Sequence, residues 1–456
     1  MEIYDISPAH SKVLPNGMLW DVGREAVGYF KICVKGKKGQ LLTLRYGEEL
    51  DENGRVRWQL RCNCNYEETW MLSGGEDVLD NFDYKAFRYV EVLSDEPFDV
   101  LDTKMTVRHY PYSERASYAV ARDNQALQRI LRLCADTVKY GTQEVFVDCP
   151  TREKGQYLGD VSIAARAHAV LTKDTSMMKK AILNFCESTF ICKGMMAVST
   201  SSLMQEIADY SLQFAAQVLW LYRMDGDLDF LKKVEPFVAG IYQHFLQFVN
   251  SDGLLECVRD KWNLVDWPQN LRDGYDFELT KPIGEGVHNV INAFWCGFLE
   301  SYDEILRILK KDTTGRTKST KNAYVCAFYD ESVGLFRDTP SSQHYAIHSN
   351  VLPLLFGIGT EEAERRGPIV ELIRSKKLSS MGVYMAYFTL AALRRVGEDE
   401  LAVTLATDPD CWLLMLKEGA TTTFEAWGKD QKWNTSLFHP WATAPLIVFA
   451  DGVLPY

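Results

Sequence analysis

The hydrophobic pattern of this chain changes once, near residue 120, and that change limits what the chain can fold into. Before it, short segments of β-forming residues are separated by turn residues such as Lys35-Gly36 and Asp51–Gly54, a pattern typical of strands joined by turns. We expect strands at 29–34, 41–46, 68–72, 87–92 and 105–109. Short strands at this spacing predict an antiparallel β-sandwich of the jelly-roll kind.

From Asn124 onward, apolar residues recur every three or four positions, as at Leu127, Ile130 and Cys134, which is the period of an amphipathic helix. We expect helices at 160–172, 174–190, 206–224, 228–250, 285–310, 346–357, 361–375, 383–395 and 437–450. So many helices are typical of an (α/α)6 barrel, although other large helical domains share the pattern. We therefore predict a multidomain, mainly α protein, with a β-sandwich domain at 1–115 and an (α/α)6-barrel catalytic domain at 116–456.

The charge balance limits the partners of the protein. With 50 basic and 62 acidic side chains, the chain carries a net charge of -12. Nucleic acids and anionic membranes attract positive charge, so we expect neither as a partner, whereas a neutral substrate is compatible with this charge. The sequence lacks both a membrane-spanning apolar run and a secretory signal at its N-terminus. We therefore expect a cytoplasmic protein, and an oligomer is compatible with the sequence.

The 11 cysteines are odd in number and scattered along the chain. Only Cys62 and Cys64 are close in sequence, and a single C-x-C pair is a weak metal signal. We expect free thiols in a reducing compartment. The sequence also lacks a phosphate-binding glycine loop of the Walker type. We therefore predict no metal and no other cofactor.

One stretch, EVFVDCPTREKGQYLGD, concentrates charge in a short loop. Asp148, Glu153 and Asp160 lie close together in sequence with Arg152 among them, and an expected helix begins at Asp160. A helix cap with surface charge would explain this pattern. The two glycines and Tyr157 instead favour a tightly shaped functional loop.

Two further stretches contain carboxylates in apolar surroundings. LMQEIADYSLQFAAQVLWLY has Glu206 and Asp209 near the start of an expected helix, where acidic residues often only complement the helix dipole. GATTTFEAWGKDQKWNTSLFHPWATA has Glu425 between aromatic residues, which makes it a candidate for a raised pKa or a sugar-facing role. His439 follows 14 residues later, and a lone histidine at such a position is usually structural.

These stretches resemble motifs of the bacterial α-L-rhamnosidases, glycoside hydrolase family 78. The first is similar to D-C-P-x-R-E-x-x-G-W-x-G-D, with Gly155 one place early and Tyr157 in place of Trp. The third is similar to G-A-T-T-x-W-E followed by S-x-x-H, with Phe424 in place of Trp. The resemblance covers about residues 20–450. Many relatives continue into a C-terminal β-domain beyond the point where this chain stops, so we expect a compact form.

The resemblance implies an inverting glycoside hydrolase that removes terminal α-L-rhamnosyl residues by general acid and general base catalysis. It implies Glu206 as the acid and Glu425 as the base, with Asp209 as the first substitute for the acid. Nearby carboxylates would raise the pKa of Glu206 and keep it protonated. The residues implied to bind substrate are Asp148, Arg152, Glu153, Tyr157, Asp160, Tyr210, Trp262, Asp266, Trp267 and His439.

Two alternative functions stay open at this point. The departures at Tyr157 and Phe424 are compatible with an inverting hydrolase that acts on a different sugar. A non-catalytic sugar-binding homologue is the other alternative, but such a protein would be expected to have lost both catalytic carboxylates, and Glu206 and Glu425 are present.

Overall fold

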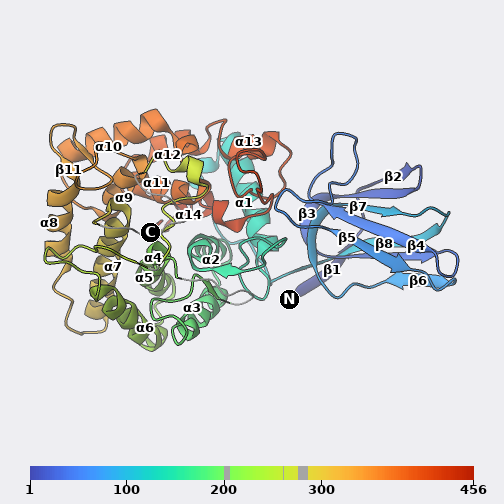
Figure 1. Ribbon diagram of the computed structural model, residues 1–456, viewed down its shortest axis with the longest axis horizontal. Coiled ribbons are helices and arrows are strands. Elements are labelled where there is room, and N and C mark those ends of the chain that lie inside the picture. Colours follow the sequence, from blue (N-terminus) through green and yellow to red (C-terminus); the bar gives the residue numbers. More distant parts are fainter. Residues whose placement is uncertain (200–205, 260, 276–285) are drawn as a thin grey trace.

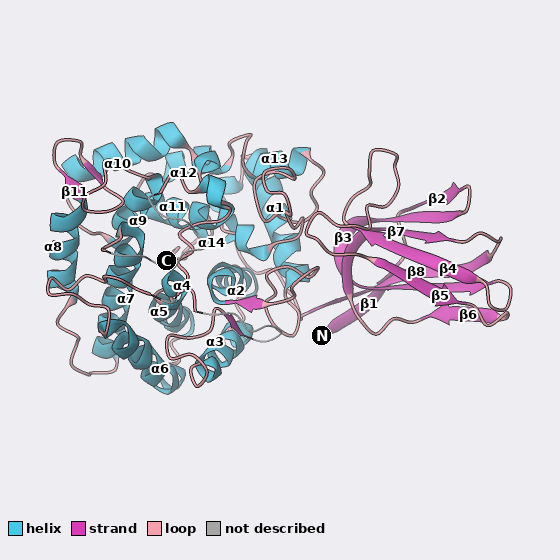
Figure 2. Ribbon diagram, in the orientation of Figure 1, coloured by secondary structure: helices cyan, strands magenta, loops and turns pink. Residues whose placement is uncertain are grey.

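The computed structural model describes residues 1–199, 206–259, 261–275 and 286–456. A β-domain lies beside a larger helical domain, and the chain passes from one to the other once (Figures 1 and 2). The last strand of the β-domain ends at His109 and the first α-helix begins at Gln125. In the described part of the chain, no helix is long and apolar enough to cross a membrane.

The long strand β3 (Gly17–Lys35) connects the two halves of the β-domain. Its first part pairs with β2 (His10–Leu14) and β7 (Lys85–Leu93), and its second part pairs with β8 (Asp99–His109) and β6 (Glu76–Leu79). The strands farther from β3 are β1 (Glu2–Ile6), β4 (Leu41–Gly47) and β5 (Glu67–Met71). All these pairs are antiparallel, and β3 changes register on β7 between Asp21 and Ala26.

Three of these strands, β1, β2 and β6, were not predicted from the sequence. Each pairs with one neighbour only, and most of its side chains are exposed or half-buried. An edge strand with two solvated faces lacks the alternation of apolar and polar residues on which the prediction relied.

The helical domain has a closed inner ring. Within the described residues, its helices are α2 (Leu158–Thr172), α5 (Phe214–Asp225), α7 (Asn289–Ile308), α9 (Ile347–Phe356), α11 (Val383–Arg395) and α14 (Pro445–Val448). From α5 to α14 each packs on the next, and α14 packs on α2. The side chain of Gln217 on α5 donates to the carbonyl of Leu158 on α2 and completes the ring. All residues of α2 and α9 are buried, the few polar ones included, as expected for inner helices that are covered on every side.

An outer helix packs on each inner helix. These are α1 (Gln125–Gly141), α3 (Ser176–Ser188), α6 (Leu228–Leu246), α8 (Thr317–Phe328), α10 (Ala363–Lys376) and α12 (Asp399–Ala406). Helices α3, α6, α8, α10 and α12 each follow the inner helix on which they pack, and α1 packs on α14 from the other end of the helical domain. The short elements are α4 (Ala208–Ser211), α13 (Trp412–Lys417), β9 (Gln156–Tyr157), β10 (Val198–Ser199), β11 (Tyr329–Asp330), β12 (Leu335–Phe336), and the 3-10 helices Ala119–Ala121, Gln269–Leu271, Leu378–Ser380 and Pro440–Ala442.

Several helix predictions need correction. The expected helix at 206–224 is two helices, α4 and α5, and Glu206 precedes both. The expected helix at 437–450 contains only two short pieces that begin at Pro440 and Pro445, because proline starts a helix easily but interrupts one that is already running. Helix α8 was missed because its sequence is rich in lysine and threonine and has a weak apolar pattern.

Close packing between α7 and α9 gives a test of the ring. A Cβ atom at Gly297 would lie 2.5 Å from Cε1 of Phe356, so Gly297→Ala should lower the free energy of unfolding by roughly 1–3 kcal/mol. The matched control is Gly240→Ala on α6, where nothing lies within 4 Å of the added atom, and a gain of roughly 0.5–1 kcal/mol is expected. Urea denaturation measures both changes, and equal effects would contradict this packing.

Candidate active site

A cavity of about 190 Å³ lies where the segments that precede α2, α4, α7 and α14 meet. All site residues predicted from the sequence line this cavity, except Glu206 and Asp266. Its lining residues are Asp148, Arg152, Glu153, Tyr157, Asp160, Ile207, Tyr210, Trp262, Leu264, Trp267, Glu425, His439 and Trp441. Residues nearly 300 positions apart in the chain therefore share one site.

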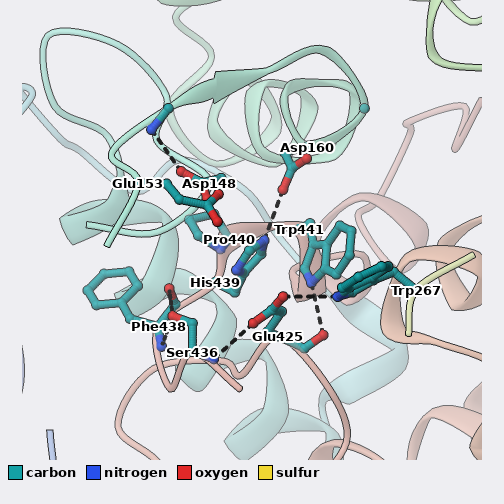
Figure 3. Close-up of polar contacts among 12 residues, drawn as sticks. Asp148, Glu153, Asp160, Trp267, Glu425, Ser436, Phe438, His439, Pro440 and Trp441 are labelled. Atoms are coloured by element: carbon teal, nitrogen blue, oxygen red, sulfur yellow. Dashed lines mark hydrogen bonds and ion pairs between the residues drawn. The ribbon is translucent and has the colours of Figure 1, made fainter. Parts of the chain in front are cut away.

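Hydrogen bonds hold both oxygens of the Glu425 carboxylate. Oε1 accepts from Nε1 of Trp267 at 3.1 Å and from Nη2 of Arg152 at 3.2 Å, and it also binds Nζ of Lys432. Oε2 accepts the backbone N–H of Ser436 at 2.9 Å, and Figure 3 shows these contacts of Trp267 and Ser436. The carboxylate is therefore fixed in one orientation.

The environment of Glu425 keeps it ionised. Burial raises the pKa of this carboxyl, but the positive charges of His439, Lys432 and Arg152 outweigh burial and bring the pKa to about 2. Lys432 was not predicted from the sequence. Its side chain is only 3% exposed, and Nζ lies 5.1 Å from the centre of the Trp267 ring. The one signal that could have found it is its place in the loop between Glu425 and His439.

Asp148 and Glu153 form a carboxyl pair that Figure 3 shows apart from Glu425. Oδ1 of Asp148 accepts the backbone N–H of Gly155 at 2.8 Å. Burial, followed by the hydrogen bond to Glu153, raises the pKa of Asp148 well above its usual value. Burial also acts to raise the pKa of Glu153, but the bond from Asp148 and the charge of Arg152 lower it to about 2. The pair therefore holds one proton between its members, mainly on Asp148.

Arg152 connects the two acidic groups of the cavity. Its Nε donates to Oε1 of Glu153 at 2.7 Å, its Nη2 donates to Glu425, and its Nη1 donates to the carbonyl of Asn434 at 2.9 Å. Because one guanidinium reaches both carboxylates, their bonded oxygens lie no more than about 8 Å apart, a bound that includes carboxyl separations of both retaining and inverting glycosidases.

A second polar pair joins Asp160 and His439. Nε2 of His439 lies 3.0 Å from Oδ1 of Asp160, which belongs to the first turn of α2 (Figure 3). The backbone N–H of His439 donates to the carbonyl of Thr423 at 2.7 Å. Burial raises the pKa of Asp160. Asp160 therefore faces the cavity instead of capping its helix, the alternative that its position in the sequence suggested.

Aromatic side chains form the walls of the cavity. Tyr210 packs so closely on α2 that a Cβ atom at Gly159 would lie 2.2 Å from its Cε1, and this explains a glycine at that position. Nε1 of Trp441 donates to the backbone carbonyl of Glu425 at 3.2 Å, and its ring lies 4.6 Å from that of His439. Flat apolar surfaces with a polar edge suit the C–H faces of a sugar ring. Trp441 was missed from the sequence.

The comparisons with known proteins agree with this architecture. Residues 116–452 match the family described as the bacterial alpha-L-rhamnosidase 6 hairpin glycosidase domain, and residues 11–109 match the bacterial alpha-L-rhamnosidase concanavalin-like domain. This chain belongs to the bacterial α-L-rhamnosidase family. The predicted family and the predicted fold class, a β-domain followed by a six-hairpin helical domain, are confirmed.

Several α-L-rhamnosidases are similar over most of this chain. The α-L-rhamnosidase of Streptomyces avermitilis is 23% identical over 434 residues, which are 91% of this chain and 39% of that protein. The GH78 rhamnosidase of Bacillus sp. GL1 has a TM-score of 0.82 at 18% identity, covering 95% of this chain and 46% of the other. The rhamnosidase from Klebsiella oxytoca, solved with rhamnose bound, has a TM-score of 0.78 at 17% identity, with coverages of 97% and 88%. The chain spans less than half the length of the curated relatives it matches.

Within this rhamnosidase-family site, Glu206 does not have the position expected of a general acid. Its carboxylate points away from the cavity and binds Nζ of Lys261, with Nε2 of His244 and Sγ of Cys192 each at 3.3 Å. Burial raises the pKa of Glu206, but its bonds to His244 and Lys261 outweigh burial and lower it. An ionised carboxylate outside the cavity cannot protonate a leaving group there, so this assignment is corrected.

Asp209, the substitute for the acid, is also directed elsewhere. Its two oxygens accept the backbone N–H groups of Leu264 and Val265, each at 3.0 Å. Burial raises the pKa of Asp209 to about 6. The carboxyl nevertheless lies behind the cavity wall that Leu264 helps to form, where it holds that segment in place.

Asp266, which was expected to bind substrate, supports the Trp267 loop instead. Its Oδ2 accepts the backbone N–H of Gly382 at 2.7 Å and lies 2.8 Å from Nε2 of His348. Its Oδ1 accepts the backbone N–H of Trp267 at 2.8 Å. Asp266 is fully buried, and it ties this loop to α9 and to the start of α11, so that Trp267 can reach Glu425.

One group among the described residues offers three ligand atoms to a cation. Atoms of Asp148, Cys149 and Glu153 lie within 4.8 Å of one another. Burial raises the pKa of the Cys149 thiol, and the two carboxyls share a proton. Because metal ligands must lose their protons, these donors suit a hydrogen-bonded pair better than a cation. The absence of a metal stays a prediction.

The contacts of Lys432 predict a change in the pH profile. Lys432→Met removes a positive charge beside Glu425 and so raises the pKa of that carboxylate, which must be ionised if it acts as a base. The acid limb of kcat/KM should move to higher pH, and the plateau should fall roughly 10- to 100-fold because the carboxylate loses an anchor. Rates with a nitrophenyl glycoside across pH measure both effects.

Two variants serve as controls for this experiment. Lys432→Arg keeps the charge and should keep the acid limb in place, whereas Lys417→Met removes an exposed lysine of α13 and should change neither quantity. An acid limb that stays unmoved in Lys432→Met would contradict the role given to this lysine.

Proposed function

We propose that this protein is an inverting glycoside hydrolase that removes terminal α-L-rhamnosyl residues from glycosides or oligosaccharides. The observation that supports this best is the presence, in one cavity, of an ionised glutamate and a carboxyl pair that holds a proton. Inversion at a sugar carbon needs one carboxyl group in each state. Family membership supports rhamnose as the sugar, as does the Klebsiella oxytoca relative solved with rhamnose bound.

In this proposal Glu425 is the general base. Three donors occupy its Oε1, whereas the only hydrogen bond of Oε2 among the described residues comes from the backbone N–H of Ser436. Oε2 therefore keeps a lone pair for an attacking water. As the water oxygen bonds to the anomeric carbon, its proton passes to Oε2, and the new C–O bond forms opposite the one that breaks.

Glu153 is the general acid, and Asp148 is the source of its proton. The Glu153 side chain is 35% exposed, whereas Asp148 is only 2% exposed. Only Glu153 therefore reaches the open side on which a leaving group must sit. As the glycosidic bond breaks, Asp148 passes its proton to Glu153, and Glu153 passes this proton to the leaving oxygen, so the pair ends with no proton. The negative charge that forms on the pair is next to Arg152, which stabilises it.

The remaining groups of the cavity suit a small hydroxylated ring. The polar atoms of Asp160 and His439 can bond to sugar hydroxyls, and Trp262, Trp267 and Trp441 can cover the faces of the ring. Of the two aromatic departures from the family motif, Phe424 is buried outside the lining and only Tyr157 faces the cavity. Only one of the two departures, Tyr157, can therefore favour a sugar other than rhamnose.

The free cysteines support a reducing compartment, and we propose the cytoplasm. All the cysteines, 11 in total, are free thiols. Disulfides form in oxidising compartments and are rare in the cytosol.

The two acidic groups predict different kinetic signatures. Glu425→Gln and Glu153→Gln should each lower kcat by roughly 10²–10⁴-fold, the usual contribution of a positioned acid or base. Nitrophenolate leaves with little protonation, so Glu153→Gln should be milder on p-nitrophenyl α-L-rhamnoside than on a rhamnosyl disaccharide. Glu425→Gln should affect both substrates equally, and parallel assays on the two substrates measure this difference.

Glu206→Gln is the control for the acid. Because Glu206 binds Lys261 outside the cavity, this variant should leave the ratio of rates on the two substrates unchanged and lower the melting temperature. A large loss on the disaccharide alone would return the role of acid to Glu206 and remove it from Glu153.

The stereochemistry of the product is a separate prediction. Direct attack by water on an α-L-rhamnoside should release the β-anomer first. Proton NMR of the first turnovers, recorded before the anomers equilibrate, measures this outcome. Release of the α-anomer would mean that a carboxylate acts as nucleophile, at roughly 5–5.5 Å from its partner, and Glu425 would then not be a base.

A further inference from the structure

A second carboxyl pair lies in the β-domain, where it meets the helical domain. Glu25 is in β3 and Glu48 directly follows β4, and both side chains are buried. The two carboxyl groups lie close enough for each to shift the pKa of the other. Oε1 of each is buried without a hydrogen-bond partner in the described part of the chain. Two ionised carboxylates have no donor to share, so this pair must hold a proton.

The pair contacts segment 421–439, which contains Glu425, at two places. We call residues 421–425 its first arm and residues 436–439 its second arm. On one arm, the backbone N–H of Glu25 donates to Oγ1 of Thr421 at 2.9 Å, and the hydroxyl of Thr422 lies 3.0 Å from Oε2 of Glu25. On the other arm, the backbone of Leu437 hydrogen-bonds to Glu48. The pair is therefore attached just before Glu425 on one arm and just before His439 on the other.

Backbone bonds join the two arms and transmit this attachment to the site. The N–H of Glu425 donates to the carbonyl of Ser436 at 2.9 Å, and the N–H of His439 donates to the carbonyl of Thr423 at 2.7 Å. Ser436 also donates its own N–H to Oε2 of Glu425. A shift of either arm would therefore move the base carboxylate and the histidine together.

The charged and titratable groups that face the pair are Arg88, Glu49, Cys62, Cys64 and Tyr66. Burial and the charge of Glu49 favour the protonated form of the pair, whereas the charge of Arg88 favours the ionised form. Arg88 donates two hydrogen bonds to Asp21, at 2.9 and 3.0 Å, so its charge is paired there. Glu49 is likewise paired with Arg61 and Lys429. Burial raises the pKa of Glu25 to about 7 and that of Glu48 well above its usual value.

We propose that the protonated Glu25–Glu48 pair is a positioning device by which the β-domain holds segment 421–439, and that its loss of a proton to solvent above neutral pH loosens this segment. This inference rests on the proposed function only where it concerns catalysis. Two buried negative charges repel each other, and the bonds to Thr422 and Leu437 cannot hold both carboxylates together against that repulsion.

The sign of the pH effect follows from the raised pKa values. A carboxyl that is harder to ionise in the folded than in the unfolded state contributes stability at low pH and loses it as pH rises through the folded pKa. The wild-type protein should therefore lose thermal stability as the pH rises from about 5 through 7 and further as Glu48 ionises, and protection of segment 421–439 should fall as the pair ionises above about pH 7. Loss of the proton held by Asp148 and Glu153 would also lower the rate at alkaline pH. Rate measurements alone therefore cannot separate this effect from a loosening of segment 421–439.

The test is Glu48→Gln, examined by hydrogen exchange of segment 421–439 with mass spectrometry. The amide can donate to Glu25 and accept from Leu437 at any pH, so it mimics the protonated side chain. At pH 9, exchange in this segment should be about 5- to 10-fold slower in the variant than in the wild type, and at pH 6 the two should be equal. The melting temperature should fall less with pH in the variant.

Glu52→Gln is the matched control, because it removes the same charge from an exposed side chain four residues away. It should behave as the wild type at both pH values. Equal exchange in Glu48→Gln and the wild type at pH 9 would overturn the inference. If no rhamnoside is hydrolysed at all, the proposed function fails, whereas exchange and melting still decide whether this pair holds the segment.

Discussion

The active site depends on one constraint, which is that the carboxylate of Glu425 must stay ionised although it is buried. Removing an ionised carboxylate from water costs several kcal/mol unless other charges and donors replace the water. Arg152, Lys432 and Trp267 supply these donors, and they come from three separate parts of the chain. The helical barrel brings these parts of the chain together. The fully buried Asp266 holds the Trp267 loop in place.

The two acidic groups of the cavity obtain opposite protonation states from similar burial. At Glu425 two cations bind the carboxylate, whereas the ionisable neighbour of Asp148 is another carboxyl, so one group loses its proton and the other keeps it. Arg152 bonds to Glu153 and Glu425 at once. Such a division of pKa values between neighbouring groups is what acid–base catalysis at one pH requires.

The sequence predicted the fold class and most of the cavity, because hydrophobic period and motif spacing are local properties. It could not predict the direction of a side chain. Glu206 was placed in a helix, but its backbone carbonyl accepts the N–H of Trp262, and Lys261 draws its carboxylate out of the cavity. Lys432 was overlooked for the same reason, since a lysine in a loop is usually solvated and only the folded chain brings this one to Glu425.

The β-domain belongs to the active site more closely than its separate fold suggests. The segment between Glu425 and His439 lies against it, and the side chain of Phe438 is part of the β-domain core together with Phe30 and Phe87. On the same segment, Lys429 and Asp430 bind Glu49 and Arg61 of the β-domain. Apolar burial alone would tolerate small sliding movements, whereas hydrogen bonds and ion pairs fix one register. Glu425 is therefore positioned between two domains, and the precision of the site depends on the contact between them.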